Sequence, residues 1–223
     1  MSNKVLVIGK TGQLARCLEE CAHSAPALQL EFSGRDELDL SKPEKIAGYI
    51  AQKAPAIVIN AAAYTAVDKA EDDEELATLV NAVAPGEIAK GASMVDAPVV
   101  HVSTDYVFDG TSRRSYRESD PVNPLGVYGR SKLAGELAVS QANHQYVIIR
   151  TAWVYSAYGN NFVKTMLRHG SARDELSVVD DQIGNPTSAH DLATVILQIA
   201  KSMANNRKDA SFGVYHAAGT GAG

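Results

Sequence analysis

Cysteine is scarce in this chain of 223 residues, which contains only Cys17 and Cys21. The two stand four residues apart on an expected helix, a spacing that favours reduced thiols on one helix face over a framework disulfide. No further cysteine or nearby histidine completes a ligand set around them, so we expect no metal centre here. The two thiols suit the reducing interior of a cell.

The sequence also lacks an excess of positive charge and a long apolar run. It has 21 Lys and Arg against 26 Asp and Glu, a formal net charge of −5, which argues against a nucleic-acid partner. No apolar run approaches the roughly 18–20 residues of a membrane-spanning helix. Residues 1–4 lead into a strand pattern without a signal-peptide cleavage region. We expect a cytoplasmic protein that binds neither nucleic acid nor a membrane.

What the sequence does have is a regular alternation of strand and helix patterns. Short apolar runs predict strands at residues 5–8, 28–32, 56–60, 99–103, 146–150, 176–179 and 214–216. Apolar residues at helical spacing predict helices at residues 13–22, 44–52, 74–91 with an interruption near Pro85, 125–142, 162–169 and 190–204. Continuous apolar strands suit a parallel sheet covered on both faces, so the alternation predicts a Rossmann-type doubly wound α/β fold.

The segment between the first strand and the first helix is rich in glycine. It reads Gly9, Lys10, Thr11, Gly12, Gln13, Leu14 and Ala15, a G-x-x-G-x-x-A pattern. Glycines permit a tight turn and let backbone N–H groups approach a pyrophosphate, while the small Ala15 keeps the helix close to the strand. A plain turn is the alternative, but the strand before it and the helix after it favour a dinucleotide cofactor.

Loops and turn residues become more frequent after Thr151. We therefore expect residues 1–150 to form an NAD(P)-binding Rossmann domain, and residues 151–223 to form a smaller substrate-binding lobe interleaved with the last strands of the sheet. The chain stops at a glycine-rich segment, residues 219–223, directly after a strand. We expect further sequence to follow, so that this lobe is a partial one.

Residues after the second and third strands suit the rest of a dinucleotide site. Arg35 stands where an acidic residue would accept a hydrogen bond from the ribose, and an arginine can accommodate a 2′-phosphate. This favours NADPH over NADH, unless Arg35 is a solvated surface residue. Asp39, followed by Leu40, could place a carboxylate beside the adenine, or Asp39 and Ser41 could cap a helix. Small residues after the third strand permit a cofactor to lie there, or permit close helix packing: Ala62, Ala63, Tyr64 and Thr65.

A tyrosine and a lysine, Tyr128 and Lys132, stand four residues apart on an expected helix and share one face of it. The lysine cation is expected to lower the tyrosine's pKa from its usual value of about 10 and so produce a proton donor that works near neutral pH. Thr104 and Asp105 end the strand upstream. Thr104 could donate to a substrate carbonyl, and Asp105 could orient a sugar hydroxyl or cap a turn. An ordinary helix-face contact is the alternative, but with the glycine loop the pattern predicts hydride transfer to a carbonyl.

The chain resembles the extended short-chain dehydrogenase/reductase family in segments spread over its length. They are GKTGQLA, NAAAYTAVDKAE, STDYVFDG, NPLGVYGRSKLAGE, RTAWVYSAYGNNFVKTML and VVDDQIGNPTS. The resemblance implies the branch that uses NADPH, or NADH, to reduce the C4 keto group of a dTDP-linked 4-keto-6-deoxyhexose, which gives dTDP-L-rhamnose for bacterial surface polysaccharide. It implies that Tyr128 protonates the C4 oxygen, Lys132 holds the nicotinamide ribose and Thr104 tunes the carbonyl.

The same resemblance implies binding residues. It implies substrate contacts by Asp105 and by Trp153, whose flat ring suits stacking on a sugar or base. It implies a cofactor contact at Val102, and it places Asn161 and the loop of residues 182–187 near the nucleotide.

Two departures from the family are visible. Its members are longer, with a C-terminal segment that completes the substrate lobe, so we expect an incomplete pocket here. Some members form homodimers and bind a divalent cation such as Mg²⁺ at the dimer contact through acidic residues. The matching positions here are Ala15, His190 and Asp191, and only Asp191 is acidic, so we expect no strong metal site.

Two other functions remain open on the sequence. One is an extended reductase or epimerase that acts on another nucleotide sugar with the same catalytic residues. The other is a non-catalytic cofactor-binding module, similar to the regulatory subunit of methionine adenosyltransferase. The intact Tyr128 and Lys132 favour an enzyme over this module.

Overall fold

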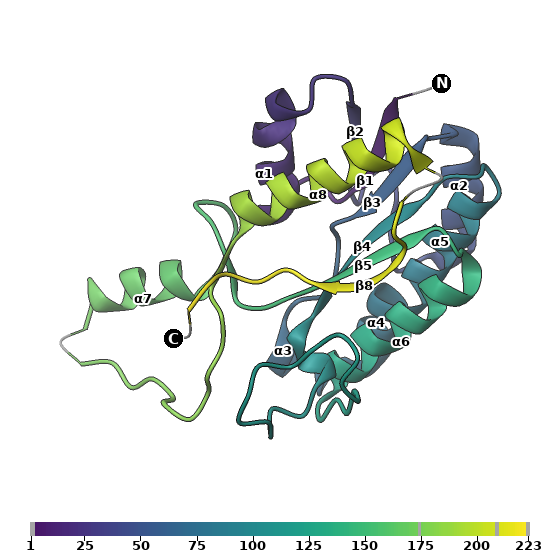
Figure 1. Cartoon of the computed structure of the whole chain (residues 1–223). Helices are drawn as coiled ribbons and strands as arrows, with labels where there is room; N and C mark the ends of the chain where they lie inside the picture. The colour runs from purple at the N-terminus through teal and green to yellow at the C-terminus, as the bar shows by residue number, and fades with distance from the viewer. Residues whose placement is uncertain (1–2, 174, 208–209, 222–223) are drawn as a thin grey trace.

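Six parallel strands form one sheet at the centre of the molecule (Figure 1). The computed structural model describes residues 3–173, 175–207 and 210–221. The strands are β1 (Lys4–Ile8), β2 (Gln29–Ser33), β3 (Ile57–Asn60), β4 (Val99–Thr104), β5 (Tyr146–Thr151) and β8 (Gly213–His216). Their order is β2-β1-β3-β4-β5-β8, which confirms the doubly wound α/β fold.

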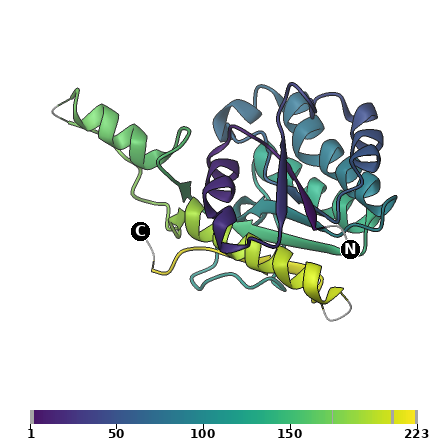
Figure 2. The same ribbon diagram turned by 90° about the horizontal axis from the view of Figure 1, so that it is seen from above.

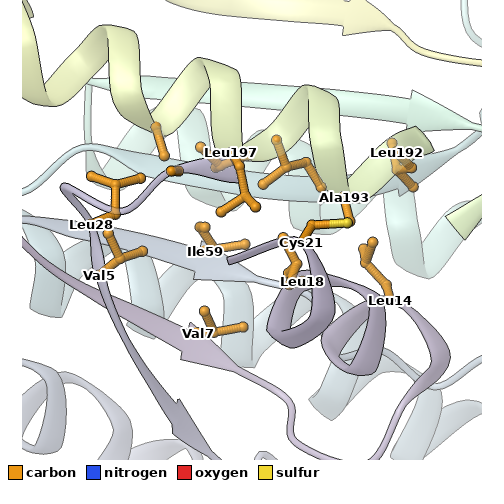
Figure 3. Packing of buried hydrophobic residues seen from close by; sticks show 14 of the residues in the cluster. Val5, Val7, Leu14, Leu18, Cys21, Leu28, Ile59, Leu192, Ala193 and Leu197 are labelled. Atoms are coloured by element: carbon orange, nitrogen blue, oxygen red, sulfur yellow. The ribbon is translucent and has the colours of Figure 1, made fainter. Parts of the chain in front are cut away.

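Helices cover both faces of the sheet because successive strand residues point in opposite directions (Figure 2). Val5 and Val7 pack with α1 (Gln13–Cys21) and α8 (Ala189–Asn205) on one face (Figure 3). Leu6 and Ile8 pack on the other face with α2 (Ile46–Lys53), α5 (Ala84–Ser93) and α6 (Val127–Ala142). Each such side chain is at most 1% exposed, a burial that stabilises the fold by about 1.5–3 kcal/mol per residue.

The helix predicted over residues 74–91 consists of α4 (Glu74–Thr78), a π-helical turn (Leu79–Val83) and α5. The predicted interruption thus lies just before Pro85. Proline has no N–H, and its ring crowds the carbonyl four residues earlier, here that of Asn81. Gly135 of α6 packs against this carbonyl, and a Cβ at that position would overlap the oxygen. Glycine therefore lets α6 approach the π turn closely.

The chain leaves the sheet after β5. It forms β6 (Val154–Tyr155), α7 (Phe162–Gly170) and β7 (Thr187–Ser188), and β6 pairs with β7. Helix α7 projects away from the sheet and has no buried residue (Figure 2). The strand predicted at residues 176–179 is wrong, since these residues have no regular structure. Leu176 is 39% exposed and Val179 is 67% exposed, and in the described chain no strand pairs with this segment.

The remaining predicted strands and helices are confirmed to within two residues at each end. A short helix that the sequence did not predict, α3 (Val67–Ala70), precedes α4. Cys17 and Cys21 are buried free thiols, as expected. None of the helices in the described part of the chain has the length and apolarity that a membrane crossing requires.

Candidate active site

A cavity of about 890 Å³ lies at the carboxyl ends of the strands. The chain runs from β1 outward to β2 and then crosses back to β3 on the other side of β1. Loops that follow β1 and β3 therefore diverge to opposite faces, and such a reversal point is where open α/β sheets bind ligands. The predicted site residues that line the cavity are Gly9, Lys10, Thr11, Gly12, Gln13, Leu14, Arg35, Asp39, Leu40, Ala62, Ala63, Tyr64, Thr65, Val102, Thr104, Asp105, Tyr128, Lys132 and Trp153.

The glycine loop leaves the N-terminus of α1 open toward this cavity. Gly9 has φ +110°, a conformation that favours glycine, and a Cβ there would lie 3.4 Å from the backbone of Ala61 and Ala62. Gly12 is the N-cap residue of α1, and no side chain bonds to the N–H groups of this turn. A Cβ on Gly12 would meet no atom within 4 Å. Free N–H groups facing open space fit a phosphate at a helix N-terminus.

Charged residues after β2 form one wall of the cavity. The Arg35 side chain is 79% exposed, and its Nε lies 3.7 Å from Asp39 Oδ1. Lys10 Nζ donates to Glu37 Oε1 at 3.0 Å. Asp39 lines the cavity and also caps a turn, since its Oδ1 accepts from the N–H and hydroxyl of Ser41 at 3.0 and 2.7 Å. These hydrogen bonds lower the pKa of the Asp39 carboxyl. Asp39 thus lies where a bound ligand could reach it, and its carboxylate caps a turn and not a helix.

The loop after β3 is tied to α6 by one buried amide. Asn81 Oδ1 accepts from the N–H of Tyr64 at 2.8 Å, and Asn81 Nδ2 donates to the carbonyl of Tyr64 at 3.0 Å. The same amide nitrogen lies 3.1 Å from the hydroxyl of Ser131 on α6. The loop after β3 and the helix that carries Tyr128 are thus fixed to each other.

The structure corrects the predicted effect of Lys132 on Tyr128. Burial raises the pKa of Tyr128 to about 12, while a hydrogen bond with Thr104 acts in the opposite direction. Lys132 Nζ donates to the carbonyl of Val102 at 2.7 Å and is not among the groups that shift Tyr128. Burial also lowers the pKa of Lys132 to about 8. The predicted lowering is therefore wrong, because burial raises the pKa of Tyr128 while the Lys132 ammonium bonds to the carbonyl of Val102.

Thr104 is held in a fixed orientation at the end of β4. Its Oγ1 donates to Asp105 Oδ1 at 3.0 Å and accepts from the N–H of Tyr106 at 3.2 Å. Burial raises the pKa of Asp105, and the bond from Thr104 opposes this. The ring of Tyr106 meets that of Tyr128 edge to face, with centroids 5.5 Å apart. Thr104 and Asp105, which the sequence predicts as site residues, therefore lie beside Tyr128.

Trp153 forms the wall that follows β5. It has φ +46° and is 38% exposed. The predicted loop of residues 182–187 packs behind it, since a Cβ on Gly184 would lie 2.6 Å from the indole. Asn161 does not line the cavity, although Asn160 and Phe162 do. The Asn161 side chain caps α7 by accepting from the N–H of Lys164 at 3.1 Å.

Among the cavity residues that the sequence did not predict, Tyr106 and Thr151 are polar residues at or just after a strand end. Tyr106 stands two positions after Thr104, and its place just beyond a strand end was the available signal. Thr151 also lines the cavity, and its buried Oγ1 has no hydrogen-bond partner among the described residues. Its strand-end position at β5 is the equivalent of that of Thr104 on β4, since the two are register partners.

The positions that the resemblance matched to a cation site lie elsewhere. Ala15 is buried in α1, His190 Nε2 lies 3.3 Å from Cys21 Sγ, and the N–H of Asp191 bonds to Ser188 in the N-cap of α8. Within residues 3–173, 175–207 and 210–221, no three His, Cys, Asp or Glu side chains are grouped to hold a metal ion.

Comparisons with known proteins identify the family. The sequence model described as "RmlD substrate binding domain" matches residues 3–223. The dTDP-4-dehydrorhamnose reductase of Sinorhizobium fredii is 44% identical over 218 residues, which cover 98% of this chain and 73% of that protein. The reductase of the same name from Escherichia coli K12 is 43% identical over 219 residues, covering 97% and 73%.

Solved structures agree with this. A dTDP-4-dehydrorhamnose reductase from Bacillus anthracis, in complex with NADP, has a TM-score of 0.91 and 37% identity, and the match covers 100% of this chain and 76% of that one. A UDP-glucose 4-epimerase from Brucella ovis, at 17% identity and a TM-score of 0.83, shares the fold. The family model, the identities and the shared architecture lead to one conclusion: the chain belongs to the RmlD substrate binding domain family, the family of the dTDP-4-dehydrorhamnose reductases.

Proposed function

We propose that the protein uses NADPH to reduce the C4 keto group of dTDP-4-dehydro-L-rhamnose, which gives dTDP-L-rhamnose. The observation that carries this proposal is the gathering of Tyr128, Lys132 and Thr104 beside the glycine loop in one cavity. The 44% identity to a named reductase supports the choice of substrate. NADP in the related Bacillus anthracis structure supports the choice of cofactor.

The residues present fit a dinucleotide. The open N-terminus of α1 suits the pyrophosphate, because its N–H groups carry no side-chain cap. Arg35 can approach a 2′-phosphate, since its side chain is 79% exposed and its contact to Asp39 is a long one, and this favours NADPH. Lys132 holds the nicotinamide ribose. When bound there, the cofactor supplies the hydride that the carbonyl carbon accepts.

Tyr128 acts as the proton donor in this proposal. Its pKa of about 12 keeps the hydroxyl protonated at neutral pH, as a general acid requires. The C4 oxygen becomes an alkoxide, which is a stronger base than a tyrosinate, so the proton moves from Tyr128 Oη to that oxygen. Lys132 lies one turn away on the same helix face, and its ammonium donates to the carbonyl of Val102.

Thr104 and Asp105 act as a pair at the carbonyl. The Thr104 hydroxyl has one hydrogen, and in the structure this hydrogen goes to Asp105. Thr104 can donate to a substrate carbonyl once Asp105 releases it.

The segment after Thr151 provides the substrate wall in this proposal. Trp153, Asn160 and Phe162 line the same cavity as the catalytic residues. The half-exposed indole of Trp153 presents a flat apolar surface to a sugar or base. Residues 151–223 thus contribute the substrate lobe, and residues 1–150 contribute the dinucleotide site.

A panel of nucleotide sugars tests the choice of substrate. NADPH oxidation is followed with dTDP-4-dehydro-L-rhamnose, with its UDP counterpart and with other dTDP-linked 4-keto sugars. The proposal predicts the largest kcat/KM for the first compound. A larger value for another keto sugar would replace this substrate, and binding of NADPH without turnover on any of them would indicate a non-catalytic module.

A further inference from the structure

A buried ion pair lies beneath the catalytic helix and is not part of the cavity wall. Arg150 of β5 and Glu136 of α6 are 7% and 4% exposed. Arg150 Nη2 donates to Glu136 Oε2 at 2.7 Å, and Arg150 Nε donates to Glu136 Oε1 at 3.0 Å. Ser103 of β4 donates to the same carboxylate at 2.5 Å. Glu136 is thus anchored to two neighbouring strands at once.

Glu136 also shares a helix face with Lys132, four residues earlier. Residues at this spacing have Cβ atoms roughly 5–6 Å apart. Both side chains point from α6 toward β4, where Lys132 bonds to Val102 and Glu136 bonds to Ser103. The Lys132 side chain is itself only 2% exposed. A carboxylate this close is therefore a counterion for a cation that water does not solvate.

The other titratable groups around Lys132 leave Glu136 as its counterion. On β4, His101 is fully buried, and its Nδ1 accepts from Asn60 Nδ2 at 3.0 Å. Burial, followed by the charge of Lys132, holds the pKa of His101 well below its ordinary value, so the ring is neutral. Tyr128 on α6 is also neutral. Burial lowers the pKa of Lys132, and Glu136 opposes this.

We propose that Glu136, held in place by Arg150 and Ser103, is a positioning residue that keeps Lys132 charged and in register with Tyr128. This inference rests on the function proposed above. It assigns the pair a role beyond packing: Glu136 acts through Lys132, and Arg150 acts through Glu136. Since the two partners of the pair carry opposite charges, their removal has opposite electrostatic effects on Lys132.

Glu136→Gln and Arg150→Gln make a matched test, because each breaks the same ion pair with a side chain that still forms hydrogen bonds. The turnover of the keto sugar and the affinity for NADPH are measured from pH 6 to 9 for both variants. At alkaline pH, turnover falls as Lys132 loses its proton, and this part of the pH profile is the alkaline limb. Loss of the Glu136 charge moves the alkaline limb down by about one pH unit. The factor by which turnover falls in Glu136→Gln is therefore about five times larger at pH 8 than at pH 6. Loss of the Arg150 charge leaves this limb in place or moves it up.

Both variants are expected to melt at lower temperature than the wild type, since each leaves a buried group without its partner. Glu136→Asp keeps the charge and should restore the wild-type alkaline limb even if its Tm stays low. If Glu136→Gln does not fold, the double variant Glu136→Gln/Arg150→Met removes both charges, and its limb should still lie below that of the wild type. Equal losses at every pH in both single variants would overturn the proposal and leave the pair a purely structural role.

The two arms of the experiment separate this inference from the proposed function. A wild-type protein that oxidises no NADPH with the keto sugar contradicts the function. The pH dependence of NADPH affinity still tests Glu136 in that case, because Lys132 contacts the cofactor. A wild type that turns over, with both variants following its pH profile, contradicts the inference alone.

Discussion

Helices α6 and α7 both reach the cavity, but the rest of the protein holds them very differently. Helix α6 buries seven of its residues, including Ser131, Lys132 and Glu136, and polar contacts fix it to β4, β5 and the π turn. Helix α7 buries none, and Phe162 and Leu167 are 63% and 69% exposed. In the proposed function, the proton donor Tyr128 thus lies on the firmly packed helix, while Phe162 of the substrate wall lies on one with few tertiary contacts.

This difference predicts unequal effects of the same change in the two helices, and the largest is on stability. Gly135→Ala in α6 should lower the free energy of unfolding by about 3 kcal/mol, because its Cβ overlaps the Asn81 carbonyl. Gly170→Ala in α7 is the control, since the nearest atom to its Cβ, Leu176 Cδ1, is 3.9 Å away. That variant should change stability by less than about 0.5 kcal/mol. Similar denaturation midpoints for the two variants would remove the contrast.

Lys132 is expected to lower the free energy of unfolding, although the proposed function requires it. A lysine pKa lowered from 10.5 to about 8 by burial means that folding disfavours the charged form. Lys132→Met should therefore raise the free energy of unfolding at pH 7 by about 2 kcal/mol while it removes turnover. Chemical denaturation and NADPH oxidation measure the two effects. A variant that is less stable than the wild type would contradict this account.

The same pKa predicts a pH profile. Lys132 loses its proton as the pH rises through about 8, so NADPH affinity and turnover should be full below that pH and fall above it. Tyr128 titrates only near 12 and cannot cause this limb. NADPH affinity in Tyr128→Phe should therefore fall over the same pH range as in the wild type. A limb that disappears in this variant would assign it to the tyrosine instead.

A substitution in the exposed helix α7 should change substrate affinity alone. Phe162 lines the cavity but is mostly solvated, so Phe162→Ser should leave stability within about 0.5 kcal/mol of the wild type. The KM for the sugar nucleotide should rise a few-fold with kcat nearly constant, because only uniform binding is lost. Leu167→Ser, on the same helix but outside the cavity wall, is the matched control. A large fall in kcat would show that α7 takes part in positioning the reacting groups.

The smallest expected effect is on the choice between NADPH and NADH. The Arg35 side chain is 79% exposed, so water screens its charge strongly. Arg35→Gln should reduce the preference for NADPH by about twofold without changing the Tm. Ratios of kcat/KM for the two cofactors measure this. An unchanged ratio would show that Arg35 is a solvated surface residue, which is the alternative that the sequence leaves open.

The contrast between the two helices also explains what sequence could predict. The strands, the glycine loop and the Tyr128–Lys132 spacing are local patterns, so the sequence places them correctly. The strand predicted at residues 176–179 fails because a strand needs a neighbour, which local pattern does not reveal. The pKa direction of Tyr128 was wrong because it depends on burial, a property of the folded protein.

The Glu136–Arg150 pair shows the same limit more sharply. The two residues are 14 positions apart and lie on different elements. Their contact depends on the position of α6 over β4 and β5, and neither residue stands out in composition or spacing. For Asn161 the sequence instead suggests a role that the structure does not show. The family resemblance places it near the nucleotide, but its side chain caps α7.

The role of Tyr128 as proton donor is the central claim, and one comparison tests it directly. NADPH oxidation with dTDP-4-dehydro-L-rhamnose and the Kd for NADPH are measured side by side in wild type and Tyr128→Phe. The account predicts a kcat lower by a factor of about 10²–10⁴ in the variant, with a Kd within about twofold of the wild type. A variant that keeps its affinity for NADPH and turns over within about threefold of the wild-type rate would contradict the account.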